Sequence, residues 1–239
     1  MLSSLVLSHP LAHQCCFGAP PCYKIWINLP KASKMATPCY KMLWAEDIPK
    51  RVVGTTGAAS GPSAAVEVTV VAGALPGFDA PPEPPPNSYA QSATAEMLVV
   101  TVKLAAGASW TLPATASGGG PGLHRNVYFY SGGAVSIAGK VFTSQVKVKV
   151  RPEVDVEIRA EAGGVAEVLI LQGREIGEPV VQHGPFVGNT REDITKAFQD
   201  YQSTGFGRWP WEGDALAFPR ERPRFAKFAD GSLVEKPLP

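Results

Sequence analysis

Alternating hydrophobic and polar residues predict several β-strands. Residues 66–70 and 146–150 alternate strictly, which is typical of strands with one buried face and one solvated face. Residues 154–159 repeat this pattern after Pro152. More continuously apolar segments suit strands covered on both faces, and these are 97–104, 127–130 and 165–171. Clusters of glycine, serine and proline predict turns at 54–62, 118–122 and 131–133. We therefore expect an all-β domain of roughly eight short strands.

One helix is predicted near the C-terminus. Thr190 is a favourable N-cap, Asp193 stands at the third helical position, and acidic residues occupy the first turn. Apolar residues then recur at the spacing of one helical face: Ile194, Ala197, Phe198 and Tyr201. The apolar run 168–171 and a connector rich in glycine and proline precede this helix.

The connector 171–187, together with 189–194, closely resembles the C-terminal signature of the pirin family, a branch of the cupin superfamily. Further segments of the same resemblance are 25–30, 40–49, 81–89, 106–113, 207–211 and 224–227. The similarity covers residues 23–236. It implies an all-β fold: a cupin-type double-stranded β-helix barrel with one C-terminal helix and an extended tail.

The resemblance also suggests a domain layout. Residues 1–22 match nothing in the family and are expected to be a disordered leader. Residues 23–50 correspond to a connecting segment left from a first cupin, 51–173 to the cupin barrel, and 174–239 to a connector, helix and tail that pack on it. The favoured interpretation is a truncated or mis-started gene product. Organelle targeting stays open, although transit peptides are rich in arginine and none precedes Arg51.

Candidate metal ligands are scarce. The resemblance implies that pirins hold iron in the first cupin, through three histidines and one glutamate, a ligand set suited to non-haem Fe(II). The histidines of this chain contain no His-x-His pattern and are His9, His13, His124 and His183. Counted from Gly107, the motif of the second cupin would place ligands at Pro113 and Thr115, and neither can replace an imidazole. The return strand, 141–150, has no histidine.

We therefore predict no catalytic, cofactor-binding or metal-binding residues, and no cofactor. His124 is interpreted as a hydrogen-bonded residue at a strand edge or barrel mouth. His9 and His13 have helical spacing, but they lie beside Pro10 in the unmatched leader. All four cysteines precede residue 40, without zinc-ribbon spacing, and are Cys15, Cys16, Cys22 and Cys39. Free thiols are favoured, with a disulfide or a metal site as the alternatives.

Composition narrows the possible partners. With 239 residues and a net charge of +1, the chain has no electrostatic drive toward nucleic acid or anionic lipid. No apolar run is long enough to span a bilayer. The proline run 81–86 is interpreted as a connector, and Trp209 and Trp211 as residues that pin the tail. The basic tail residues Arg220, Arg222, Arg224 and Lys227 are interpreted as a solvated surface.

Two functions remain open from the sequence. The first is a non-catalytic pirin-like module for protein interaction, of the transcription-cofactor type. The alternative is one part of a metal-dependent flavonol (quercetin-type) dioxygenase, if a metal-binding cupin is supplied. We expect a protein partner or self-association, no membrane, and no direct nucleic-acid binding. The expected location is the cytoplasm or nucleus.

Overall fold

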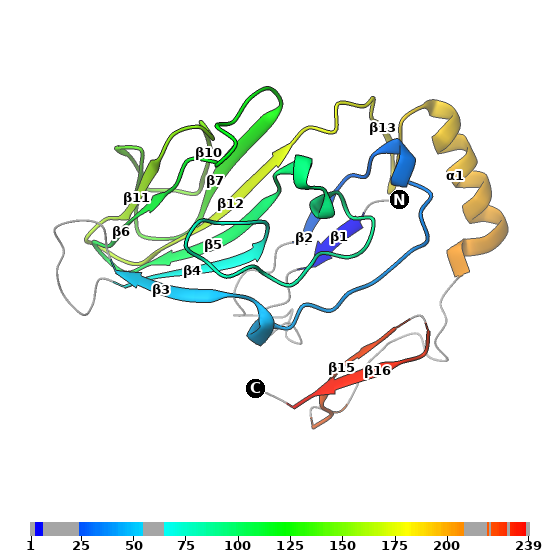
Figure 1. The fold of residues 1–239 in the computed structure, drawn as a ribbon, viewed down its shortest axis with the longest axis horizontal. Helices are drawn as coiled ribbons and strands as arrows, with labels where there is room; N and C mark the ends of the chain where they lie inside the picture. Colours follow the sequence, from blue (N-terminus) through cyan, green and yellow to red (C-terminus); the bar gives the residue numbers. More distant parts are fainter. Residues whose placement is uncertain are drawn as a thin grey trace. The chain divides into compact units, whose positions relative to one another are not determined.

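The computed structural model describes residues 3–6, 24–54, 65–207, 219, 221–228 and 230–237. The chain divides into two compact units. We call residues 43–84 and 90–177 the sandwich unit, and residues 1–42, 85–89 and 178–239 the tail unit. Each unit is considered by itself (Figure 1).

The described residues of the sandwich unit form two antiparallel sheets. The larger sheet has the strand order β10-β7-β12-β5-β4-β3. Its strands are β3 (Lys50–Gly54), β4 (Ala65–Ala72), β5 (Leu98–Leu104), β7 (Leu123–Gly132), β10 (Val146–Val150) and β12 (Ala166–Arg174). The smaller sheet has the order β6-β11-β8-β9. Its strands are β6 (Ser109–Leu112), β8 (Val135–Ile137), β9 (Lys140–Phe142) and β11 (Val156–Ala160). Short 3-10 turns accompany them: η2 (Ala45–Asp47), η3 (Tyr89–Gln91) and η4 (Ala93–Ala95).

Side chains from both sheets form one hydrophobic core. Alternate positions of β4, β5 and β12 contribute fully buried valines, such as Val68, Val100 and Val168. The smaller sheet contributes Leu112 and Ile158, which are also fully buried. Because successive side chains in a strand point to opposite faces, every second residue reaches this core. Pairing among the described strands gives two separate sheets and does not close them into one barrel.

Most predicted strands are confirmed, with two corrections. β10 has the predicted bounds, and β4, β5 and β12 contain or closely match the predicted segments. The prediction that the strand at 127–130 is buried on both faces is wrong. Val127 and Phe129 are buried, but Tyr128 and Tyr130 on the other face are partly exposed. Tyrosine suits a half-buried position because its ring is apolar and its hydroxyl is polar. The turn predicted at 131–133 begins later, since β7 continues to Gly132 past a bulge at Tyr130, which has no register partner in β12.

Within the described residues, the tail unit contains three hairpins and one α-helix. The hairpins are β1 (Ser3–Val6) with β2 (Lys24–Ile27), β13 (Val181–His183) with β14 (Phe186–Gly188), and β15 (Arg224–Lys227) with β16 (Leu233–Lys236). Helix α1 (Arg191–Thr204) follows β14, and the 3-10 turns are η1 (Lys31–Ser33) and η5 (Gly205–Gly207). Of the predicted leader, residues 3–6 form β1, and residues 1–2 and 7–22 lie outside the described part. The helices of the described ranges are all too short or too polar to cross a membrane.

Helix α1 begins as the sequence predicts. Thr190 Oγ1 accepts a hydrogen bond from Asp193 N at 3.2 Å, and Asp193 Oδ2 accepts one from Thr190 N at 2.9 Å. This is a capping box. The apolar face predicted for the helix packs on the β13–β14 hairpin: the Phe186 and Phe198 rings are 4.7 Å apart, and Phe186 lies 6.1 Å from Tyr201. The helix ends at Gly205, whose φ of 58° is left-handed.

Candidate functional site

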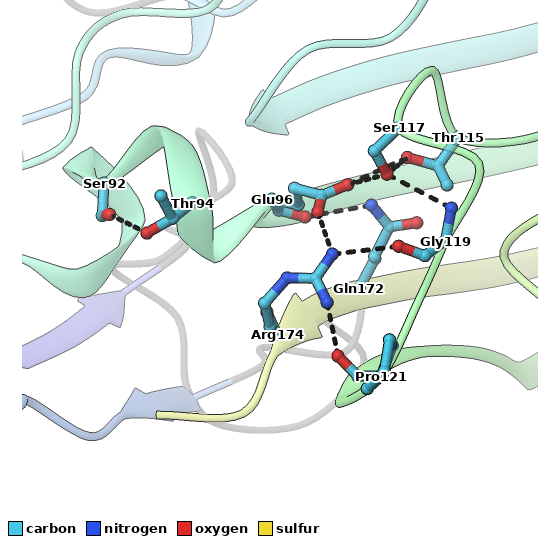
Figure 2. Close-up of polar contacts among 9 residues, drawn as sticks. All are labelled: Ser92, Thr94, Glu96, Thr115, Ser117, Gly119, Pro121, Gln172 and Arg174. Carbon is cyan, nitrogen blue, oxygen red and sulfur yellow. Dashed lines mark hydrogen bonds and ion pairs between the residues drawn. The ribbon is translucent and has the colours of Figure 1, made fainter. Parts of the chain in front are cut away.

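Polar side chains gather at one end of the sandwich unit. We call this cluster the polar end, and it consists of Glu96, Thr115, Ser117, Arg125, Gln172 and Arg174. Glu96 ends η4, Thr115 and Ser117 lie in the loop after β6, and the other three come from β7 and β12. Figure 2 shows Arg174 and Gln172 pointing toward Glu96 and the loop.

Strand periodicity places two of these polar residues in the core. Arg125 is in phase with the buried residues Val127 and Phe129 of β7. Gln172 is in phase with the buried residues of β12 and pairs with Arg125 in the strand register. A polar side chain at such a position needs hydrogen-bond partners, because burial without them is unfavourable.

The Arg125 guanidinium connects the two sheets. This side chain is only 2% exposed. Its Nε donates to Gln172 Oε1 at 2.7 Å, and its Nη1 donates to the carbonyl oxygen of Pro113 at 2.7 Å. Because Pro113 follows β6 of the smaller sheet, Arg125 ties β7 and β12 to that sheet. Burial lowers the pKa of Arg125 from its ordinary value, while the Asp155 carboxylate raises it. The guanidinium stays a cation.

Glu96 and Arg174 form an ion pair that also binds the loop at 115–121, and we call this pair the clasp. Arg174 Nη2 donates to Glu96 Oε1 and, at 3.1 Å, to the carbonyl oxygen of Gly119 (Figure 2). Glu96 Oε2 accepts from Ser117 Oγ at 2.5 Å and from Thr115 Oγ1 at 3.2 Å. Arg174 Nη1 also donates to the carbonyl oxygen of Pro121, and Gln172 Nε2 to that of Glu96. One continuous hydrogen-bonded network therefore runs from Arg125 to this loop.

The backbone around the clasp is unusual. Glu96 has a φ of 45°, which is uncommon for a residue with a side chain. Glycines with positive φ punctuate the loop: Gly118, Gly119, Gly120 and Gly122. The glycines adopt these angles without steric cost, whereas the backbone of Glu96 must be held by its surroundings. The clasp provides the surrounding bonds.

Glu96→Gln is expected to destabilise the chain by about 2 kcal/mol near neutral pH, since hydrogen bonds to charged groups contribute about 1.5–3 kcal/mol. Hydrogen bonds from Ser117 and Arg174 lower the pKa of Glu96 below its ordinary 4.5. Its contribution is therefore fully present above pH 4.5 and is lost as the pH falls through the lowered pKa. Urea unfolding of the unmodified chain and of Glu96→Gln, at pH 7 and below pH 4, measures this effect. The difference between their free energies of unfolding should be smaller in acid. A difference in unfolding free energy that is the same at both pH values would contradict the prediction.

The polar end does not suit an iron ion. Of the two motif positions counted from Gly107, Pro113 offers only a carbonyl oxygen, which accepts from Arg125, and Thr115 bonds to Glu96. The fixed cations Arg125 and Arg174 repel a divalent ion. No group of three His, Cys, Asp or Glu side chains within the described ranges could hold a metal. Absence of a metal site from the whole chain stays a prediction.

The candidate residues of the sequence lie elsewhere. His124 is hydrogen-bonded, as expected, with Nε2 2.6 Å from Glu175 Oε1. His183 packs edge-on against Phe198 at 5.4 Å. Cys39 is an exposed free thiol whose Sγ lies 3.1 Å from the carbonyl oxygen of Pro86. Of the basic tail residues, Arg222 and Arg224 are partly exposed and Lys227 is exposed. Other candidates lie outside the described residues, and these are His9, His13, Cys15, Cys16, Cys22, Trp209, Trp211 and Arg220.

The sequence did not single out Glu96, Arg125, Gln172 or Arg174. Arg125 and Gln172 could have been found from the sequence, because both occupy positions that alternate in step with the buried residues of their strands. No local signal pairs Glu96 with Arg174, since 78 residues separate them.

Two antiparallel sheets around one core, with one described α-helix elsewhere in the chain, define a mostly β protein. The model of the pirin C-terminal cupin domain matches residues 99–207. The chain belongs to the pirin family.

The relatives support this placement. A pirin-like protein of Caulobacter vibrioides is 32% identical, over 77% of this chain and 58% of its own. Pirin-1 of Arabidopsis thaliana is 30% identical, over 77% of this chain and 57% of its own. A crystal structure of quercetin 2,3-dioxygenase from Acinetobacter baumannii matches with a TM-score of 0.60 and 25% identity, over 77% of this chain and 56% of that one. The chain therefore spans less than two thirds of the length of these relatives.

Proposed function

We propose that this chain is a pirin-like protein that acts through protein contacts, without metal chemistry of its own. The observation that carries the proposal is the polar end. At the positions where a second cupin would place metal ligands, the chain has a carbonyl oxygen bound by Arg125 and a hydroxyl bound to Glu96. Both groups serve to hold the fold together. The sandwich unit is then a scaffold.

Exposed apolar side chains in the tail unit favour a protein partner or self-association. Trp26 and Tyr40 are each 51% exposed, Val180 is 61% exposed and Met35 is 80% exposed. Large exposed apolar patches mark interaction surfaces. A standard specific interface buries about 800 Å² on each partner. The tail unit offers the side chains from which such an interface is built.

Sedimentation velocity at micromolar concentration tests this proposal. We expect a homodimer or larger assemblies, because the exposed side chains are removed from water on association. Replacing Met35 and Val180 together with serine should shift the distribution toward the monomer. The matched control is Val141→Ser in the sandwich unit, at an exposed site of similar size, which should leave the distribution unchanged. A monodisperse 25.3 kDa species in the unmodified chain would contradict the proposal.

A second candidate function is part of a flavonol dioxygenase. The likeness to the quercetin 2,3-dioxygenase of Acinetobacter baumannii favours it. This reading requires metal ligands from another cupin, because the polar end does not fit a metal. The chain alone, expressed with iron supplementation, should then contain far less than one iron per chain and consume no quercetin above the buffer rate. Stoichiometric iron, or oxygen uptake with Fe(II) that survives loss of both His124 and His183, would favour the enzyme instead.

A further inference from the structure

The chain from β7 to β10 is positively charged. Residues 123–152 contain two arginines and three lysines and no aspartate or glutamate, although the whole chain has a net charge of only +1. Arg125 is buried in the core, and Arg151 pairs with Glu153 at 2.8 Å. Lys147 and Lys149 of β10 are exposed, and neither forms an ion pair among the residues that the structure describes. Two ammonium groups of β10 are therefore available to a partner.

The two lysines lie on the solvent face of the larger sheet. The strand register places Lys147 opposite Tyr128 and Lys149 opposite Asn126 of β7. Tyr128 and Asn126 are uncharged and partly exposed. Val148, between the two lysines, packs against the core on the other face. The solvent face of β10 and β7 thus carries two positive charges beside neutral neighbours.

β10 is the terminal strand of this sheet in the part of the chain that the structure describes. Alternate residues of an antiparallel strand direct their N–H and C=O groups to opposite sides, so half of these groups in β10 face the sheet edge. An extended peptide can pair with such an edge as an added strand.

The lysines determine which strand the edge accepts. Lysines on edge strands ordinarily oppose unwanted pairing. A second copy of β10 is disfavoured, because antiparallel pairing about Val148 sets Lys147 opposite Lys149, and like charges directly opposite each other are destabilising. The same two charges favour a strand of opposite charge, since opposite charges across a strand pair are stabilising.

We propose that β10 docks an acidic extended segment of a partner protein, which joins the larger sheet as a further antiparallel strand. Carboxylates two residues apart lie on one face of an extended strand at about 7 Å, and the same spacing separates Lys147 from Lys149. Backbone hydrogen bonds supply affinity, and the two charge pairs supply selectivity. This inference goes beyond the proposed self-association, because it concerns the sandwich unit and a partner of different chemistry.

The capped peptide SVEVEVS, titrated into the full chain at low salt, tests the proposal. It should cause saturable NMR shifts of the backbone amides of residues 146–150. The neutral peptide SVQVQVS should bind about tenfold more weakly, because two cross-strand charge pairs are lost. Combining Lys147→Gln with Lys149→Gln should weaken binding of the acidic peptide by a similar factor. The matched control is Lys103→Gln, at an exposed lysine of the interior strand β5, which should leave peptide binding unchanged.

A backbone-methylated peptide separates strand addition from simple charge attraction. The acidic peptide N-methylated at two successive residues keeps both carboxylates but loses a donor on each edge, so it should bind at least tenfold more weakly. Equal binding of the methylated and unmethylated peptides, or of the acidic and neutral peptides, would overturn the proposal. Shifts confined to residues outside 146–150 would also overturn it. A short single-stranded DNA that shifts these amides more strongly than the acidic peptide would assign the face to nucleic acid instead.

Discussion

Replacing Gly132 with alanine is expected to destabilise the chain by about 4 kcal/mol or more, the range typical of severe backbone conflicts. Gly132 ends β7 with a φ of 122°, a conformation that residues with a Cβ rarely adopt. A Cβ there would lie 2.0 Å from the carbonyl oxygen of Val165 and 2.9 Å from Ala166 Cα. Both atoms belong to the backbone at the start of β12, so relief requires β12 to move away from β7.

The neighbouring glycine is a matched control. A Cβ at Gly133 would meet nothing closer than 3.7 Å, and its φ lies outside the range that strains a side chain. Gly133→Ala should therefore change the free energy of unfolding by about 0.5 kcal/mol or less. Urea denaturation of the three proteins measures both effects. Similar midpoints for Gly132→Ala and the unmodified chain would mean that the β7–β12 pairing tolerates a displacement at its bulge.

The long strands were predictable because each carries enough alternation to show its period. β4 and β10 each span several alternations, and the predicted segments match them. β8, β9, β13 and β14 have three residues each, too few to show a period of two. Two of these short strands lie in the connector that carries the family resemblance. The resemblance therefore indicated the family, but it did not show that this connector folds as a hairpin beneath α1.

The helix was predictable for a different reason. Its start depends on two residues three positions apart, Thr190 and Asp193, and such local signals are complete in the sequence. The sequence predicted only one side of the contact between the helix and its neighbours. The apolar face was predicted, but its aromatic partner Phe186 lies on a strand that the pattern did not reveal.

The polar end could not be predicted because its bonds are long-range. Arg125 and Gln172 meet across 47 residues, and their meeting depends on the register of β7 against β12. Charged residues are rarely fully buried, so an arginine in the core phase of a strand is easily taken for a surface residue. His124, its neighbour in sequence, was assigned a hydrogen bond correctly, although its partner Glu175 was not foreseen.

Glu178 connects the family connector to the segment that follows β2 within the tail unit. Its Oε2 accepts from the backbone N–H of Lys31 at 2.6 Å and from Asn189 Nδ2 at 3.0 Å. Lys34, only 6% exposed, donates from Nζ to Asn28 Oδ1 and to the carbonyl oxygen of Leu29, each at 2.7 Å. Burial lowers the pKa of Lys34, while the charges of Glu178 and Asp193 raise it. Glu178 thus both anchors residues 28–34 and helps keep a buried ammonium charged.

Glu178→Ala is therefore expected to destabilise the tail unit by about 3 kcal/mol, the upper range for hydrogen bonds to a charged group. The loss should be local. Hydrogen exchange should accelerate at the backbone amides of residues 28–34, and above all at Lys31, while the amides of β4, β5 and β12 keep their protection. The Asn189 side chain would also lose one acceptor and keep only the carbonyl oxygen of Pro179.

Glu192→Ala is the matched control for this prediction. Glu192 lies in the first turn of α1, where a negative charge stabilises the helix dipole by about 0.3–1 kcal/mol, and it is exposed. Its removal should leave exchange at residues 28–34 unchanged. Equal acceleration of hydrogen exchange in both variants would assign the effect to a general loss of negative charge. Unchanged exchange in Glu178→Ala would mean that Lys34 and its own acceptors hold residues 28–34 without Glu178. Only a selective loss in Glu178→Ala supports the view that this connector residue fixes the segment after β2.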